Sequence, residues 1–87
     1  MNDLFVELGR YLRIKRKTRS LSQNEVAKKL GYATPQFVSN FERGLCAPPM
    51  HKLKVLISIY EIPKQEILDL MLSQQELVLR KRLFDEN

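Results

Sequence analysis

The sequence has no tryptophan and only one cysteine and one histidine among its 87 residues. A single thiol cannot close an intrachain disulfide, and it is compatible with a reducing compartment. No apolar run approaches the roughly 18 residues that a membrane-spanning helix needs, and the N-terminal residues lack the order of a secretion signal. We therefore expect a cytoplasmic protein that does not enter the membrane.

The groups that enzymes and metal sites require are equally scarce. The chain has no glycine-rich phosphate loop, and Cys46 and His51 supply fewer ligands than a structural zinc ion needs. A chain of this length has room for one modest core and no separate sensor domain. We predict a protein without catalytic activity, cofactor or metal, and without a small-molecule effector.

Basic residues are in excess. Fifteen Lys and Arg against ten Asp and Glu give a formal charge of +5, and six of the bases fall within residues 10–19. Such a charge favours polyanionic partners through counterion release, although a solvated helix face is an equally good explanation of the cluster. The 44% hydrophobic content is sufficient for one folded domain.

Helical signals dominate the first half of the chain. Leu4, Leu8 and Leu12 recur every four residues and predict a helix over residues 4–17. Ser22 and Glu25 have the spacing of a capping box, which predicts a second helix over residues 22–30. Gly31 would end that helix, because a residue without a Cβ adopts the left-handed conformation at little cost.

The next segment predicts a short third helix over residues 35–43. Thr34 is its expected N-cap and Pro35 its first residue, where the missing N–H costs nothing. We expect Phe37, Val38 and Phe41 to form its apolar face. Gly44 would end it.

Prolines mark the last two helices. A loop over residues 45–49 contains two consecutive prolines, and after it apolar residues at i, i+3, i+4 and i+7 predict a fourth helix. These apolar residues are Leu53, Leu56, Ile57 and Tyr60. Pro63 precedes a fifth helix over about residues 64–84, which carries more apolar residues than one face can hold.

Residues 21–44 resemble the helix-turn-helix of the phage-repressor/Cro-like (XRE-type) family. The matching positions are Gln23, Ala27, Gly31, Glu42, Arg43 and Gly44. The resemblance extends over roughly residues 8–67 and implies an all-α, five-helix, lambda-repressor-like bundle, here with an extended C-terminal helix. Residues 1–63 would form the DNA-binding domain, and residues 64–87 a helix continuous with it. One departure from the family is the turn at residues 32–34, which is one residue longer than the commonest family spacing. The base-reading positions of the third helix could therefore be shifted by one residue.

The resemblance also implies roles for individual residues. Base readout falls to Gln36, Ser39 and Asn40, and phosphate contact to Gln23, Thr34 and Arg43. Side-chain amides suit the N6/N7 edge of adenine, and Pro35 offers only apolar contact. Gln23 can also brace the third helix. Arg16 and Glu42 resemble the structural ion pair of the family.

The C-terminal helix is the predicted dimerisation element. Its leucines at positions 68, 72, 79 and 83 form one stripe, and Leu70, Leu77 and Phe84 form a second at heptad spacing. One stripe could pack within the monomer and the other across a twofold axis, with Leu70, Leu77 and Phe84 as our candidates for the interface. Alternatively, both stripes belong to the monomer core.

The function implied is a sequence-specific regulator of transcription that binds double-stranded DNA, with a homodimer reading palindromic half-sites in the major groove. The main alternative is a protein-interaction adaptor or an antitoxin-like partner built on the same bundle. RNA binding is less favoured, because single-strand recognition uses exposed aromatic rings and we place Phe37 and Phe41 in the core.

Overall fold

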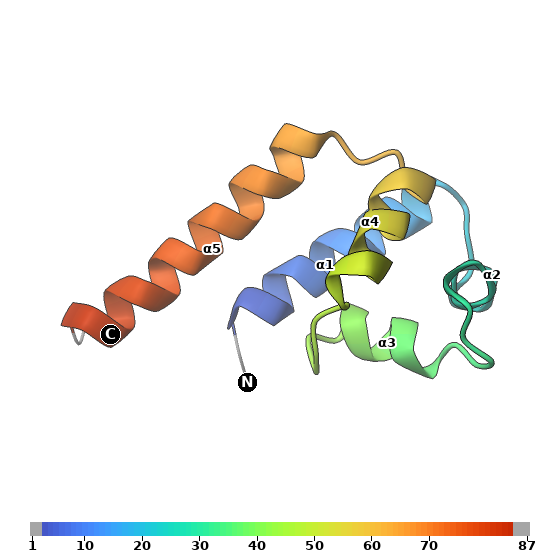
Figure 1. The fold of residues 1–87 in the computed structure, drawn as a ribbon, viewed down its shortest axis with the longest axis horizontal. Coiled ribbons are helices and arrows are strands. Elements are labelled where there is room, and N and C mark those ends of the chain that lie inside the picture. The colour runs from blue at the N-terminus through green and yellow to red at the C-terminus, as the bar shows by residue number, and fades with distance from the viewer. Residues whose placement is uncertain (1–2, 85–87) are drawn as a thin grey trace.

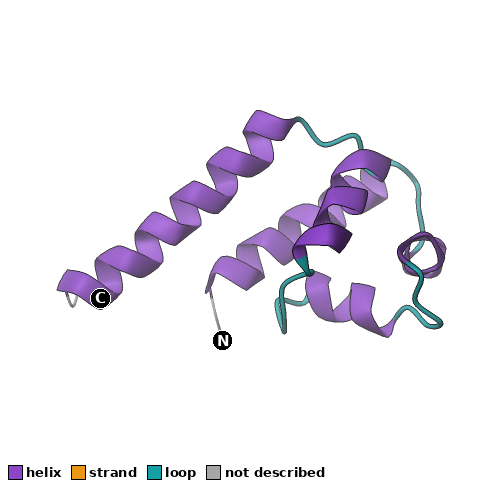
Figure 2. Cartoon of the chain, in the orientation of Figure 1, coloured by secondary structure: helices purple, strands orange, loops and turns teal. Residues whose placement is uncertain are grey.

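The computed structural model describes residues 3–84, with side chains from residue 5 onward, and within this range all regular structure is helical. The helices are α1 (Asp3–Thr18), α2 (Gln23–Leu30), α3 (Gln36–Glu42), α4 (Met50–Ile59) and α5 (Lys64–Phe84). In Figures 1 and 2, α1 to α4 gather into one body and α5 forms a long rod running back alongside α1. The predicted all-α bundle with an extended last helix is confirmed.

The core lies inside the body formed by α1 to α4, with the first turn of α5 closing one side. Every helix contributes at least one buried apolar residue, as the helical periodicities require. The buried apolar residues are Leu8, Leu12, Val26, Ala27, Leu30, Val38, Phe41, Leu53, Leu56, Tyr60, Ile62 and Ile67. The side chain of Leu4, which the sequence places on the same stripe as Leu8 and Leu12, lies outside the described part.

The ends of α2 follow their local signals. The Glu25 amide donates to Ser22 Oγ at 3.0 Å and the Ser22 amide donates to Glu25 Oε1 at 2.9 Å. Hydrogen bonding to the backbone amide and the side chain of Ser22 lowers the pKa of the Glu25 carboxyl. Gly31 has φ +84°, so the left-handed turn falls at the glycine.

The start of α3 differs from the prediction. Pro35 is the N-cap itself and α3 begins at Gln36, because the Pro35 carbonyl accepts the first helical hydrogen bond, from the Ser39 amide at 2.9 Å. Thr34, the expected N-cap, receives only a long 3.4 Å hydrogen bond from the Gln36 amide. The helix is therefore one residue shorter at this end.

Phe37 was also placed wrongly. The sequence assigns it to the core, but its side chain is 50% exposed. Val38 and Phe41 take the inward face of α3, and Phe37 lies on its flank. There it stacks on Tyr32, with ring centroids 4.7 Å apart.

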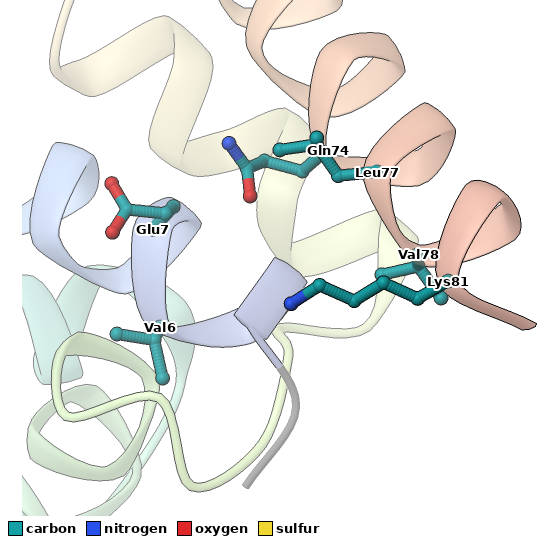
Figure 3. Close-up of a pocket in the computed structure, with 6 residues that line it drawn as sticks. All are labelled: Val6, Glu7, Gln74, Leu77, Val78 and Lys81. Carbon is teal, nitrogen blue, oxygen red and sulfur yellow. The ribbon is translucent and has the colours of Figure 1, made fainter. Parts of the chain in front are cut away.

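The beginning of α5 is anchored to the body by polar contacts with α1. Tyr11 Oη donates to Glu66 Oε1 at 2.5 Å and Lys15 Nζ lies 2.8 Å from the same oxygen, which ties α5 to α1. Farther along, the two helices leave a groove of about 290 Å³ between them, and Figure 3 shows Leu77 of α5 across it from Val6 of α1.

Both apolar stripes of α5 reach the surface. Ile67 is the buried residue of this helix, and all four leucines of the first stripe are 45–69% exposed, as are Leu77 and Phe84 of the second. The alternative that both stripes belong to the monomer core is therefore wrong. No helix in the described range is long and apolar enough to span a bilayer.

Candidate functional site

The helix-turn-helix is formed by α2, the turn at residues 31–35 and α3. Ala27 is fully buried where the two helices pack, which lets their backbones approach closely. The Tyr32 amide continues the turn by donating to the Ala27 carbonyl at 2.9 Å. In Figure 1, α2 and α3 lie on the side of the molecule away from α5. The outer side of α3 carries side chains that are exposed or half-exposed.

The outer side of α3 carries the predicted base-reading residues, and we call it the reading face: Gln36, Ser39 and Asn40. Gln36 is exposed, and Ser39 and Asn40 are half-exposed. Gln36 Nε2 donates to Asn40 Oδ1 at 3.0 Å, so the two amides are held side by side. Gln36 Oε1 and the Asn40 Nδ2 amino group take no part in this bond, and together they offer an acceptor and donors to a base edge.

The C-terminal end of α3 is fixed by a buried cluster around Glu42, which we call the Glu42 anchor. Arg16 Nε donates to Glu42 Oε2 at 2.6 Å and Arg16 Nη2 donates to Oε1 at 3.1 Å, an arrangement that matches the planar guanidinium to the carboxylate. The hydrogen bond to Glu42 raises the pKa of Arg16 above its ordinary value. The Glu42 side chain is 4% exposed, so water does not weaken this pair.

Gln23 completes the Glu42 anchor. Its Nε2 donates to Glu42 Oε1 at 2.9 Å, which links the start of α2 to the end of α3. Arg16 also donates from Nη1 to the Leu21 carbonyl at 2.8 Å, so α1 holds the approach to α2 as well. The bracing role proposed for Gln23 is thus visible, and its second Nε2–H is not used by this bond.

A glycine that sequence reasoning missed lets α1 approach α3. Gly9 is buried, and a Cβ at this position would collide with the carbonyl oxygens of Phe41 and Glu42. These carbonyls belong to the last turn of α3. A lone glycine inside a helical pattern carries no signal of such a contact, because the helix it faces is distant in sequence.

The predicted phosphate contacts lie at the ends of the two helices of the helix-turn-helix. Gln23 is the first residue of α2, Thr34 is exposed in the turn, and Arg43 is exposed at the end of α3. Gln23 is half-exposed because of its bond to Glu42.

Most of the basic cluster at residues 10–19 is paired within the molecule. Arg10 pairs with Glu7, Lys15 with Glu66, Arg16 with Glu42 and Arg19 with Glu61. Within the described residues, Arg13 and Lys17 are exposed and form no ion pair. Two of these pairs, Lys15–Glu66 and Arg16–Glu42, link α1 to other helices. The pairing leaves fewer charges of the cluster to attract an external polyanion.

A second surface runs along α4 and α5. A groove of about 540 Å³ lies between these helices, lined mainly by apolar side chains including Met50, Leu68 and Leu72. A shallower groove continues from Leu72 along α5 to Phe84. Of the predicted interface residues, Leu70 is half-buried against the core, Leu77 faces α1, and Phe84 lies at the end of this second groove.

The described part of the chain holds no group of three or more His, Cys, Asp or Glu residues able to bind a metal ion. Comparison with curated proteins and with solved structures gave no significant match. A family profile described as a helix-turn-helix domain matches residues 7–70, which covers the body and the start of α5. Together with the geometry of α2 and α3, this match shows that the chain belongs to the helix-turn-helix domain family of DNA-binding proteins, consistent with its resemblance to XRE-type regulators.

Proposed function

We propose that this protein is a sequence-specific regulator of transcription that binds double-stranded DNA. The observation that carries the proposal is the reading face, where two amide side chains are joined on the exposed side of a helix. The C-terminal end of that helix is held by the Glu42 anchor. A rigid helix with polar groups directed outward has the shape and chemistry required to read the major groove.

In the proposed complex, α3 lies in the major groove and α2 crosses the phosphate backbone. Gln36 and Asn40 hydrogen-bond to base edges, with adenine as the partner best suited to an amide. Ser39 contacts a base or a phosphate. Gln23, Thr34 and Arg43 bind phosphate oxygens and set the register without reading sequence.

We further propose that the protein acts as a homodimer through α5. We move the interface from the predicted Leu70, Leu77 and Phe84 to the other stripe, because Leu70 packs against the core and Leu77 faces α1. This stripe, the leucine strip, is exposed and contiguous with the α4–α5 groove, and it consists of Leu68, Leu72, Leu79 and Leu83. Its spacing of four, seven and four residues reads the same in both directions. Two antiparallel copies therefore match position 68 with 83 and 72 with 79, as an isologous interface requires.

A twofold dimer implies a palindromic operator, because each α3 would read an equivalent half-site. The test is to select bound fragments from a random duplex library and then titrate the selected operator with Gln36→Ala and Asn40→Ala at fixed salt. Each substitution should relax the preference at particular base pairs by roughly 1–3 kcal/mol. Purely salt-sensitive binding with no preferred sequence would contradict the proposal.

Gln65→Ala is a matched control for this experiment. Gln65 is an exposed amide on α5 that donates to a side chain four residues later, Asp69 Oδ1 at 2.7 Å, just as Gln36 donates to Asn40. It lies outside the reading face. Its removal should leave every base preference unchanged.

The exposed leucine strip also favours a second function, that of an adaptor whose α5 binds another protein. The two functions differ in what covers the strip: a second copy of this chain or an unrelated partner. Sedimentation of the purified protein distinguishes the two functions. A dimer at micromolar concentration supports the regulator, and a monomer that also lacks an operator supports the adaptor.

A further inference from the structure

Phe37 is an exposed aromatic residue next to the reading face. Half of its side chain is accessible, although it belongs to the first turn of α3, where a recognition helix comes closest to the bases. Successive helical residues are about 100° apart, so Phe37 lies about 60° from Asn40 around the helix axis. Its ring therefore borders the two amides on the side facing the turn.

The Phe37 ring is held in position by a second aromatic ring. Tyr32 stacks on it with an interplanar angle of 25°. Tyr32 is fixed in turn, because Lys52 Nζ lies 4.9 Å from its ring centroid and bonds to the Leu30 carbonyl. Phe37 thus presents a supported apolar edge and one covered face, an arrangement suited to a lateral contact in a groove and poorly suited to sandwiching an unstacked base.

We infer that Phe37 is a specificity residue that contacts the C5-methyl group of a thymine next to the bases read by Gln36 and Asn40. This inference rests on the proposed function. Thymine is the base that presents an apolar group in the major groove, and apolar side chains recognise it there. The reading face would then combine hydrogen bonding to one base pair with apolar contact to its neighbour.

The test uses the operator selected by the wild-type protein, with each thymine replaced in turn by deoxyuridine. This change removes the methyl group and keeps every hydrogen-bonding atom. One position in each half-site should lose affinity about fourfold, the factor expected for one buried methyl group. Phe37→Ala should bind the thymine and uracil forms of that position equally, while Phe37→Leu, which keeps an apolar side chain, should still prefer thymine.

Ile14→Ala is the control, because Ile14 is a similarly exposed apolar residue on α1, and it should leave the thymine preference intact. Circular dichroism checks that each variant is folded. The inference is overturned if no thymine is sensitive, if the sensitivity persists in Phe37→Ala, or if the wild-type protein prefers single strands to the duplex. If no operator is obtained, both the proposed function and this inference are contradicted. If an operator is obtained but replacement of its thymines by deoxyuridine does not change the affinity, only the inference is contradicted.

Discussion

The body of the molecule, residues 3–62, and the second half of α5 contain the same kind of apolar residue in different surroundings. In the body, Leu12 and Leu56 are nearly inaccessible, because helices that cross one another cover each other's apolar faces. On α5, Leu72 and Leu83 are more than half exposed. A leucine repeat shows that a helix has an apolar face, but whether the same chain covers that face depends on where neighbouring helices lie.

The largest effect should come from breaking the Glu42 anchor. Glu42→Ala leaves the Arg16 guanidinium buried without its carboxylate and removes the acceptor of Gln23. Loss of one partner of a buried pair costs about 3–5 kcal/mol. Urea unfolding should show a decrease of this size in the free energy of unfolding, and DNA affinity should fall because α3 is no longer fixed.

Two further variants test whether burial of the Arg16–Glu42 pair is the reason for the large loss of stability. Glu7→Ala removes an exposed ion pair, with Arg10 at 2.8 Å, and should change stability by less than about 1 kcal/mol. Replacing Arg16 and Glu42 together by apolar residues should cost less than Glu42→Ala alone, since no unpaired charge remains. If Glu7→Ala and Glu42→Ala lowered the free energy of unfolding equally, the Arg16–Glu42 pair would behave as a surface ion pair.

The next effect tests the comparison between body and α5 directly. Leu56→Ala should lower the free energy of unfolding by about 2–5 kcal/mol, because it leaves a cavity in the core. Leu72→Ala removes the same atoms from an exposed position, so at protein concentrations where the monomer predominates it should have little effect. The measurement is urea unfolding of both variants at one low concentration.

Substitutions in the leucine strip should weaken the proposed dimer, although they have little effect on the stability of the monomer. Leu72→Glu should shift sedimentation toward the monomer while the helical content of the monomer is retained. Ser73→Glu places the same charge on the next residue of α5, also exposed, and should leave the dimer intact. A dimer that survives Leu72→Glu would move the interface to another surface, such as the α1–α5 groove lined by Leu77.

A smaller effect is expected at the start of α2. Ser22→Ala removes the acceptor of the Glu25 amide and should cost about 1 kcal/mol, the usual size of an N-cap. Ser58→Ala changes an exposed serine within α4 and serves as the control. Thermal unfolding of the two variants measures the difference, and equal midpoints would mean that the cap contributes nothing.

The sequence was sufficient to predict those features of the fold that depend on neighbouring residues. The capping box at Ser22, the turn at Gly31 and the prolines before α4 and α5 each act through neighbouring residues, and every predicted helix is present with bounds close to those expected. The Arg16–Glu42 contact was within reach only through the family resemblance, because 26 residues separate its two side chains.

The sequence was not sufficient to predict which side chains are buried or paired where this depends on packing between distant segments. Phe37 lies at the border of the inward face of α3, and a small rotation of the helix decides whether it is buried. The partners of Lys15 and Arg19 are Glu66 and Glu61, which come close only when the chain has folded. Which side of α5 is covered was likewise undetermined, since both stripes are equally apolar.

The smallest effect concerns Glu66, which joins the body to α5. Lys15 and Tyr11 donate to its carboxylate and lower its pKa below the ordinary value of 4.5. A carboxyl whose pKa is lower in the folded state stabilises the fold above its unfolded pKa and loses that contribution as pH falls through the folded value. Stability should therefore decline on acidification below about pH 4.5, and Glu66→Gln should make the decline shallower.

Lys15→Met tests the cause of this pH dependence, because it removes the main donor and keeps the carboxyl group. It should flatten the decline in the same direction as Glu66→Gln, and the double variant should behave like Glu66→Gln alone. Urea unfolding at pH 7 and at several lower values gives the slopes. If Glu66→Gln leaves the slope unchanged, the start of α5 is held by Ile67 and its apolar neighbours, and the polar link to α1 orients the helix without stabilising it.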